Sequence, residues 1–360
     1  MKKTKEEKYN LFKEKIIGTV KQFYGDDYDI TVNPVQKNNG LVLYGLNILK
    51  RDTYVCPTIY LEDFFERYEG GCAFSTIFRE IVEIYERYKE PDFLDLDFFS
   101  DYEKVREVLS IKLINAEYNK EMLEDVPYRR IEDLAIVCIA EIVSPDNHLG
   151  SVLIHNNHIC MWGIRAQELI DEAIHNAMKN QDVMFEKLSD VIMELYDRTC
   201  ENDLGDEDEC VLREEMSGSE DYGHGLLGSE DFGLGSPGSD NSNLCLSGVD
   251  GWSGENEQPT MYVLSNSRQM FGAAVMAFPG ILEAIGKRLG CNYYIIPSSI
   301  HELIILPDNI SGQVSNLNEM ISSINSEMLS KEEVLSNHAY LYDISSKAVL
   351  SVKEEQMANS

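Results

Sequence analysis

Apolar positions recur along most of this chain with the spacing of amphipathic helices or of short strands. The first helix is predicted over residues 3–24, where apolar side chains return every three or four positions before Gly25. DYDITVNPVQ and LVLYGLNILK then read as strands, and Asn39-Gly40 between them supplies the positive φ angles of a tight hairpin. Pro34 indicates that the first of these strands lies at a sheet edge or carries a bulge.

Helical segments are predicted after Pro57. TIYLEDFFERYEG ends at Gly70-Gly71, and STIFREIVEIYERYKE offers Ser75 or Thr76 as its cap. DYEKVREVLSIKLINAEYNKEML continues this helical region with mixed periodicity.

Strands return from Ile131. LAIVCIAEIV is a near-continuous apolar run, which is typical of a central strand. SVLIH and HICMW flank Asn156-Asn157 and predict a second hairpin. Residues 165–180 predict a helix, and we expect residues 181–199 to be helical as well.

Predicted secondary structure resumes at Pro259. TMYVLSN predicts a strand, and GAAVMAFPGILEAIGKRLG a helix with a kink or a fresh start at Pro279 and a C-terminal cap at Gly290. CNYYIIP and HELIILP predict two strands joined by residues 298–300. A polar helix is expected over residues 315–329, and AYLYDIS with KAVLSV forms a last hairpin.

Helices and antiparallel hairpins intermix without regular βα alternation, so the predicted fold class is α+β, in two lobes with one long disordered insertion. The first lobe is placed at residues 1–130. The second combines residues 131–200 with 259–355, because LAIVCIAEIV has no other evident sheet to join. Residues 201–258 form the insertion.

The insertion contains a ten-residue repeat whose copies start at Gly218, Gly228 and Gly238. Its Gly-, Ser- and acid-rich composition predicts a disordered acidic loop. Two G-x-G-x-x-G matches fall inside the repeat, but neither follows a strand nor opens a helix, and acidic neighbours would repel a pyrophosphate. EF-hand ligand spacing is also absent. We therefore expect no cofactor.

The formal net charge is −32, and the insertion supplies −15 of it through sixteen acidic side chains against one Arg213. The negative electrostatic field of so acidic a chain opposes direct binding to nucleic acids and to anionic membranes. It favours a protein partner with a basic surface. An acidic mimic of DNA is a minor alternative.

The N-terminal MKKTKEEKYN lacks the apolar stretch of a signal peptide, and no apolar run reaches the length of a membrane span. The eight cysteines are scattered and form no C-x-x-C pair, which favours free thiols in a reducing compartment. A cytoplasmic location is expected.

Ser298, Ser299, His301 and Glu302 form the densest polar cluster inside an apolar hairpin, so they are the candidate binding residues. If Ser299 and His301 lie on one strand face, they are also candidates for hydrolytic catalysis. The simpler interpretation is turn chemistry, in which the serines satisfy backbone groups. H-E-L-I-I lacks the second histidine of a zinc-peptidase motif because Ile305 stands there.

His155 and His158 are candidate metal ligands, for which His148 or Cys160 would have to supply a third ligand. The simpler interpretation is a polar hairpin tip. Cys72 precedes a predicted helix, where a thiol can become nucleophilic, although the sequence indicates no histidine partner and an incidental thiol is the simpler interpretation.

KNNGLVLYGLNILKRDTYVCPTIYLEDFFERYEGG resembles the N-terminal signature of an uncharacterised bacterial family, domain of unknown function 5688, which is common in gut Clostridia. The segments His158–Gly163 and Pro297–Glu302 and the run MYVLSNSRQMFGAAVMAFPGILEAIGKRLG are similar to its pattern, whereas the acidic repeat is an addition. The resemblance implies a bacterial cytoplasmic protein of accessory or mobile-element gene content. It carries over no catalytic residues.

No convergent catalytic set emerges, so the sequence favours a non-enzymatic macromolecule-binding protein. The alternative is a hydrolase-like enzyme that uses Ser299 and His301, or Cys72.

Overall fold

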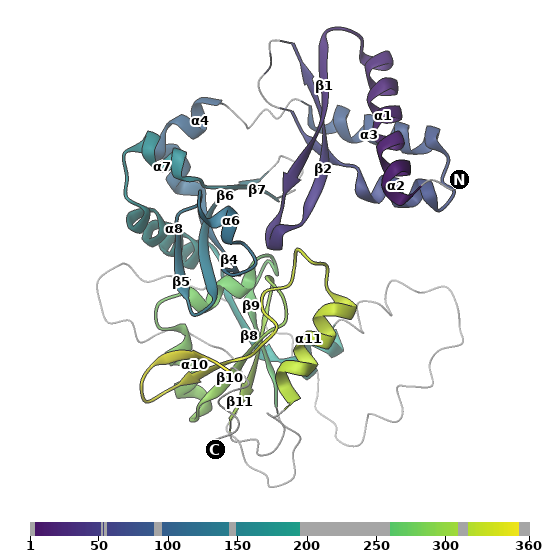
Figure 1. The fold of residues 1–360 in the computed structure, drawn as a ribbon. Helices are drawn as coiled ribbons and strands as arrows, with labels where there is room; N and C mark the ends of the chain where they lie inside the picture. The colour runs from purple at the N-terminus through teal and green to yellow at the C-terminus, as the bar shows by residue number, and fades with distance from the viewer. Residues whose placement is uncertain are drawn as a thin grey trace, which may run out of the picture.

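The computed structural model describes residues 4–51, 53, 56–89, 96–143, 149–194, 260–308 and 316–352. The predicted insertion at 201–258, both of its glycine motifs and His148 lie outside these residues. The fold is α+β, as predicted, with three antiparallel sheets (Figure 1).

Residues 5–88, called the N-terminal lobe from here on, pack three helices against the first sheet. Thr4 caps the first helix with its side chain, and Gly25 ends it, as the sequence predicts. The sheet order is β1-β2-β3, so Pro34 does lie on an edge strand. The hairpin loop takes left-handed backbone at Asn39 (φ 58°) and Gly40 (φ 64°). The elements of this lobe are α1 (Lys5–Tyr24), β1 (Tyr28–Gln36), β2 (Val42–Lys50), β3 (Thr58–Tyr60), α2 (Glu62–Glu69) and α3 (Phe74–Tyr88).

The second sheet is built around one long strand, β6 (Leu134–Val143). It pairs with β4 along one side and with β5 and then β7 along the other, so LAIVCIAEIV is central as predicted. Helix α8 (Ala166–Asn180) covers one face of this sheet. The remaining elements are α4 (Leu96–Ser100), α5 (Tyr102–Val105), β4 (Leu109–Asn115), α6 (Lys120–Leu123), β5 (Tyr128–Ile131), β7 (Leu149–Leu153) and α7 (Asn156–Trp162).

The third sheet has six strands in the order β13-β12-β10-β11-β9-β8. One face joins the large core shared with α8 and β6, and the other is covered by α11 (Leu317–Met328). Gly290 caps α10 with left-handed backbone, as predicted. The strands and short helices are β8 (Val183–Lys187), β9 (Tyr262–Asn266), η3 (Gly272–Ala277), α10 (Ile281–Leu289), β10 (Tyr293–Pro297), β11 (Leu303–Pro307), β12 (Tyr340–Asp343) and β13 (Ala348–Ser351).

Three local predictions are wrong. β4 was expected to be helical, but its first five residues, LSIKL, alternate apolar and polar side chains as a strand does, and six of its seven residues are buried. Asn156-Asn157 opens α7 instead of turning a hairpin. Residues 181–199 were expected to be helical, and residues 188–194 are, but residues 183–187 form β8, which pairs with a strand beyond the insertion.

Strand pairing also bears on the predicted lobe boundary at residue 130. The N-terminal core contains buried residues from Phe12 to Tyr85, whereas the large core begins at Val105. β4 and β5 both pair with β6, so residues 109–131 share a sheet with the second lobe. The division into lobes remains a prediction, with a boundary before α4 favoured.

Candidate functional site

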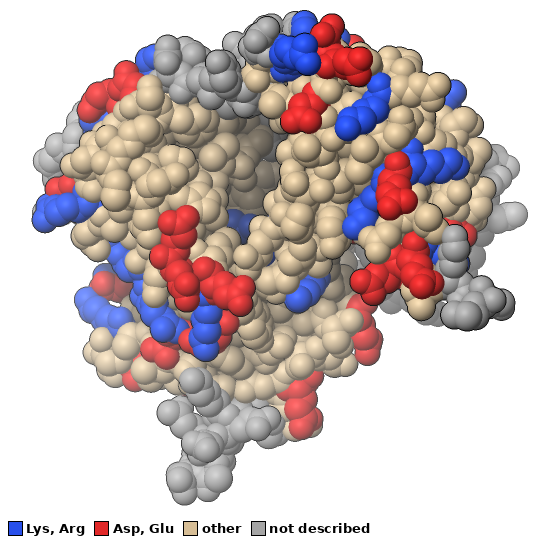
Figure 2. Space-filling model, turned by 45° about the horizontal axis from the view of Figure 1, so that its top comes forward, with Lys and Arg blue, Asp and Glu red and all other residues tan. Residues whose placement is uncertain are grey.

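Three segments that are distant in sequence meet at the β1–β2 loop: the loop itself, residues 115–119 and residues 331–335. The surface is hollowed between the N-terminal lobe and the other elements, and basic side chains lie inside the hollow (Figure 2). Clefts of this kind between lobes are frequent binding sites.

Four asparagines hold this junction together. Asn39 donates from Nδ2 to the carbonyl oxygens of Lys331 and Val334, at 2.8 and 2.6 Å. Its backbone N–H and its Oδ1 both bond the side chain of Asn119. Asn38 and Asn115 reach the carbonyls of neighbouring residues in the 332–335 turn. Because all four side chains are buried, they fix the β1–β2 loop against that turn. We call Asn38, Asn39, Asn115 and Asn119 the asparagine cluster.

Beside this cluster, His301 lies in the connection between β10 and β11. Its backbone N–H donates to Ser299 Oγ at 3.0 Å, and its carbonyl accepts from Ser265 Oγ at 2.8 Å. The ring Nδ1 accepts from the backbone N–H of Phe271 at 3.2 Å. The neutral ring therefore carries its proton on Nε2, which lies 4.0 Å from Glu333 Oε1.

The loop that presents Phe271 is conformationally strained. Gln269 and Phe271 have φ angles of 51° and 54°, which side chains other than glycine rarely adopt. Asn266 fixes the loop by donating to the carbonyl of Met270 and accepting from its N–H. Gly272 follows because a Cβ there would lie 2.5 Å from the carbonyl oxygen of His301. Strain of this kind concentrates at functional sites.

Lys112 of β4 approaches the same place. Its Nζ lies 4.7 Å from the centre of the Phe271 ring, whose plane stacks on His301 at 5.7 Å between centroids. Lys112 is partly buried, and its Nζ has no hydrogen bond or ion pair to any residue that the structure describes. We call Lys112, Phe271, His301 and Glu333 the Lys112 site.

Burial sets the electrostatics of this site. It lowers the pKa of Lys112, an effect that the carboxylate of Glu332 opposes and the ammonium of Lys37 reinforces. Burial likewise lowers the pKa of His301, against the attraction of Glu333. Both side chains are therefore less readily protonated than in water, and His301 is neutral at pH 7.

The predicted cluster is brought together only in part. Ser298 Oγ donates to Glu302 at 3.2 Å, and Ser299 is buried with its hydroxyl accepting from the His301 backbone. These contacts are turn chemistry. The residues form a loop instead of one strand face, and the Ser299 hydroxyl has no hydrogen bond to the His301 ring within the described chain. The geometry does not assemble a nucleophile with its base.

The other two candidates lie elsewhere. His155 precedes α7, where its N–H donates to Nδ1 of His158, and its own ring bonds Asp125 at 3.0 Å. Burial lowers the pKa of His158. Within the ranges that the structure describes, no group of three His, Cys, Asp or Glu is placed to hold a metal ion. Cys72 contacts the carbonyl of Ala73 at 3.9 Å, and no histidine bonds its thiol in the described chain.

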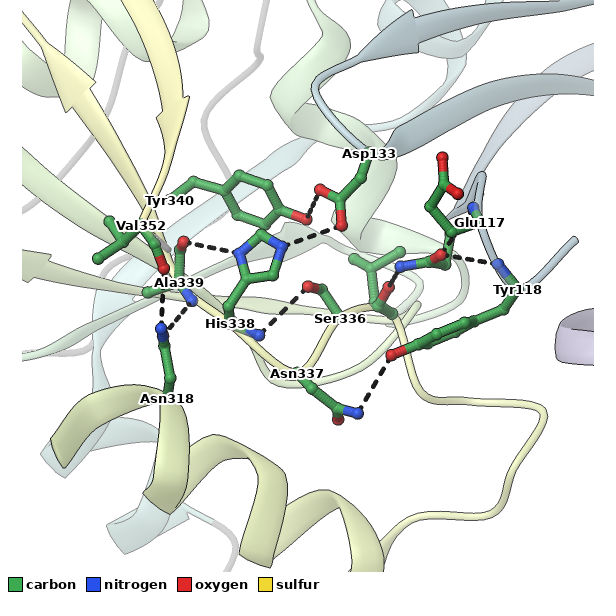
Figure 3. A network of polar contacts seen from close by, with 12 residues as sticks. Glu117, Tyr118, Asp133, Asn318, Ser336, Asn337, His338, Ala339, Tyr340 and Val352 are labelled. Carbon is green, nitrogen blue, oxygen red and sulfur yellow. Dashed lines mark hydrogen bonds and ion pairs between the residues drawn. The ribbon is translucent and has the colours of Figure 1, made fainter. Parts of the chain in front are cut away.

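Sequence reasoning missed a second polar network, centred on His338 (Figure 3). Asp133 accepts from His338 Nε2 at 2.9 Å and from the Tyr340 hydroxyl at 2.7 Å. These bonds lower the pKa of Asp133, although burial alone would raise it. His338 Nδ1 faces the carbonyl of Ala339, and Ser336 bonds the His338 backbone. Since both ring nitrogens face oxygen acceptors, this network ties the β5–β6 turn to β12 and offers no free base.

Comparison with known proteins identifies a family for this chain but no activity. None of the described helices has the length and apolarity to cross a membrane. No curated protein and no solved structure matches the chain. One family model, described as a family of unknown function, matches residues 9–344 and thus most of the chain. The resemblance found in the sequence is thereby confirmed, and the chain belongs to family DUF5688.

Proposed function

We propose that this protein is a non-enzymatic binding protein whose ligand places an anionic group beside Lys112. One observation carries the proposal. The chain has 63 acidic against 31 basic side chains, yet partly buried Lys112 has no acidic partner at ion-pair distance among the described residues. Burying a charge without a partner costs free energy, which an anionic ligand would offset.

The neighbours of Lys112 suit this role. The Phe271 ring gives the ammonium an aromatic face, and Nε2–H of neutral His301 is a second donor. The asparagine cluster and the strained 266–272 loop hold these groups in place before a ligand arrives. Such preorganisation reduces the entropy lost on binding.

The expected partner is a cytoplasmic protein with a basic surface that presents one carboxylate to Lys112. The net charge of −32 attracts a basic partner over a long range, while the Lys112 site selects for a local anionic group. The same net charge opposes a polyanion such as nucleic acid. The hydrolase alternative gains no support from the hydrogen bonds of Ser299.

The anionic group can be tested with acetate as the probe. Acetate at matched ionic strength should raise the melting temperature of the full chain, because a ligand that binds only the folded state stabilises it. Lys112→Gln should abolish that rise. Lys15→Gln is a matched control, since Lys15 also lies over an aromatic ring, that of Phe74 at 3.8 Å. An equal acetate response in the wild type and Lys112→Gln would contradict the proposal.

The macromolecular partner requires a separate measurement. Affinity capture from the source cells should recover a protein with the wild type and with Lys15→Gln, but at least about tenfold less of it with Lys112→Gln, the effect of losing about 1.4 kcal/mol. Equal recovery with all three proteins would place the interface elsewhere.

A further inference from the structure

A separate pocket of about 200 Å³ opens between β4, the end of β6, the end of α8 and the loop after β9. Its volume corresponds to about six or seven water molecules. Seven of the ten residues that line it are polar, namely Glu107, Ser110, Glu141, Asn176, Asn180, Gln181 and Arg268.

Opposite charges face each other inside this pocket. Arg268 Nη1 lies 2.7 Å from Glu141 Oε2, and the side chains are 36% and 13% exposed, respectively. Glu141 is therefore mostly buried, whereas the guanidinium at the rim keeps further N–H donors for other acceptors. Glu107 adds a second carboxylate to the lining.

The buried side of the pocket is fixed by a chain of amides. Gln181 Nε2 donates to Glu141 Oε1 at 3.3 Å and to Ser110 Oγ at 3.0 Å. Its Oε1 accepts from Asn266 Nδ2 at 3.0 Å. Asn180 lines the same space, and its side-chain amide forms no hydrogen bond within the described ranges. The Glu141 carboxylate is thus held in place, and an amide remains for a ligand.

We propose that this pocket binds a small zwitterion of the size of a free amino acid, whose ammonium faces Glu141 and whose carboxylate faces Arg268. A zwitterion can enter between the two side chains and leave neither charge unpaired. A ligand with only one charge, placed between Arg268 and Glu141, would leave one of them without a counter-charge in a partly buried place. This inference is independent of the function proposed for the Lys112 site.

The pocket can be probed with L-alanine and with two molecules that each lack one of its charged groups. L-alanine carries both charged groups, ethylamine only the ammonium and propionate only the carboxylate. In titrations of the isotope-labelled full chain followed by NMR, alanine should shift the side-chain signals of Arg268 and Gln181. Ethylamine and propionate should bind at least tenfold more weakly.

Two variants and a control complete the test. Glu141→Gln and Arg268→Gln should each weaken alanine binding at least tenfold. Arg67→Gln also removes an Arg–Glu pair, the one that Arg67 forms with Glu80 at 2.6 Å in the N-terminal lobe, and should leave binding unchanged. Each variant is compared with the wild type only after its backbone spectrum shows a folded chain.

Selective binding of alanine that depends on both charges supports the inference. Ethylamine binding as tightly as alanine would overturn it, because Arg268 would then have no part in recognition. The absence of any shift with alanine or with a panel of the other free amino acids at 20 mM, on the order of the weakest useful affinity, would also overturn it. The ion pair would then be purely structural.

Discussion

Replacing Asn39 should separate hydrogen bonding from backbone strain at the junction of the N-terminal lobe. The Asn39 side chain makes three hydrogen bonds, a buried one to Asn119 and two partly buried ones to Lys331 and Val334, and the φ angle of Asn39 is 58°. Each bond contributes about 1 kcal/mol, so Asn39→Gly should lower the free energy of unfolding by about 3 kcal/mol. Asn39→Ala adds a left-handed alanine and should cost about 1 kcal/mol more.

Urea unfolding of the full chain, followed by far-UV circular dichroism and by tyrosine fluorescence, measures both variants. Asn33→Ala is the control. The Asn33 side chain is exposed on β1 and, among the described residues, bonds only Thr31, so the cost should stay within about 0.5 kcal/mol. The double variant with Asn119→Ala should show coupling of about 1 kcal/mol to Asn39. A cost below about 1 kcal/mol for Asn39→Ala would refute the buried junction.

Other changes give further expected outcomes. Gly272→Ala should lower the free energy of unfolding by about 2–4 kcal/mol, because the added methyl overpacks the loop and breaks the Ser265 bond to His301. Its control, Gly18→Ala, lies in open space on α1 and should raise the free energy of unfolding by about 0.5–1 kcal/mol. Similar values for the two variants in urea unfolding would contradict this reasoning. Since burial lowers the pKa of His301 in the folded chain, the histidine of the unfolded state is protonated at a higher pH than that of the folded state. The free energy of unfolding should therefore fall as the pH drops below about 6.5. His301→Gln should flatten that part of a profile of melting temperature against pH. Lys112→Met should stabilise the ligand-free chain by about 1 kcal/mol, because it removes an unfavourable charge from a functional site. A destabilised variant would instead indicate that Lys112 has a structural role. Deleting residues 205–257 should leave the melting temperature nearly unchanged, because this Gly-, Ser- and acid-rich segment has little apolar area to bury; a large decrease would contradict that reasoning.

The fold could be predicted wherever local pattern and strand partner agree. The first helix, the hairpin at Asn39 and the strands on either side of residues 298–302 follow from nearby residues alone. β8 could not, because it pairs with a strand beyond the insertion, whereas the alternation of LSIKL in β4 is a local signal that the helical prediction overlooked. Strand pairing over such separations leaves no periodic signal.

The separation in sequence between residues that meet in space also limits the prediction of the site. His301 was found because its polar neighbours are adjacent in sequence. Lys112 was missed because a lysine in a segment expected to be helical looks like part of a solvated face. Asp133 and His338 are 205 residues apart, and only the folded chain brings them together.

The pairing of β8 with β9 has a consequence for engineering. Lys187 and Tyr262 are direct partners, and the N–H of Leu188 bonds the carbonyl of Met261 at 2.9 Å. Whatever connects them therefore leaves and re-enters the sheet at one edge, and its length need not alter the register of either strand. Closing a longer loop costs only about 0.6 kcal/mol for each doubling. A reporter domain or an affinity tag could therefore be inserted between β8 and β9, at the end of the strand pair where Lys187 faces Tyr262.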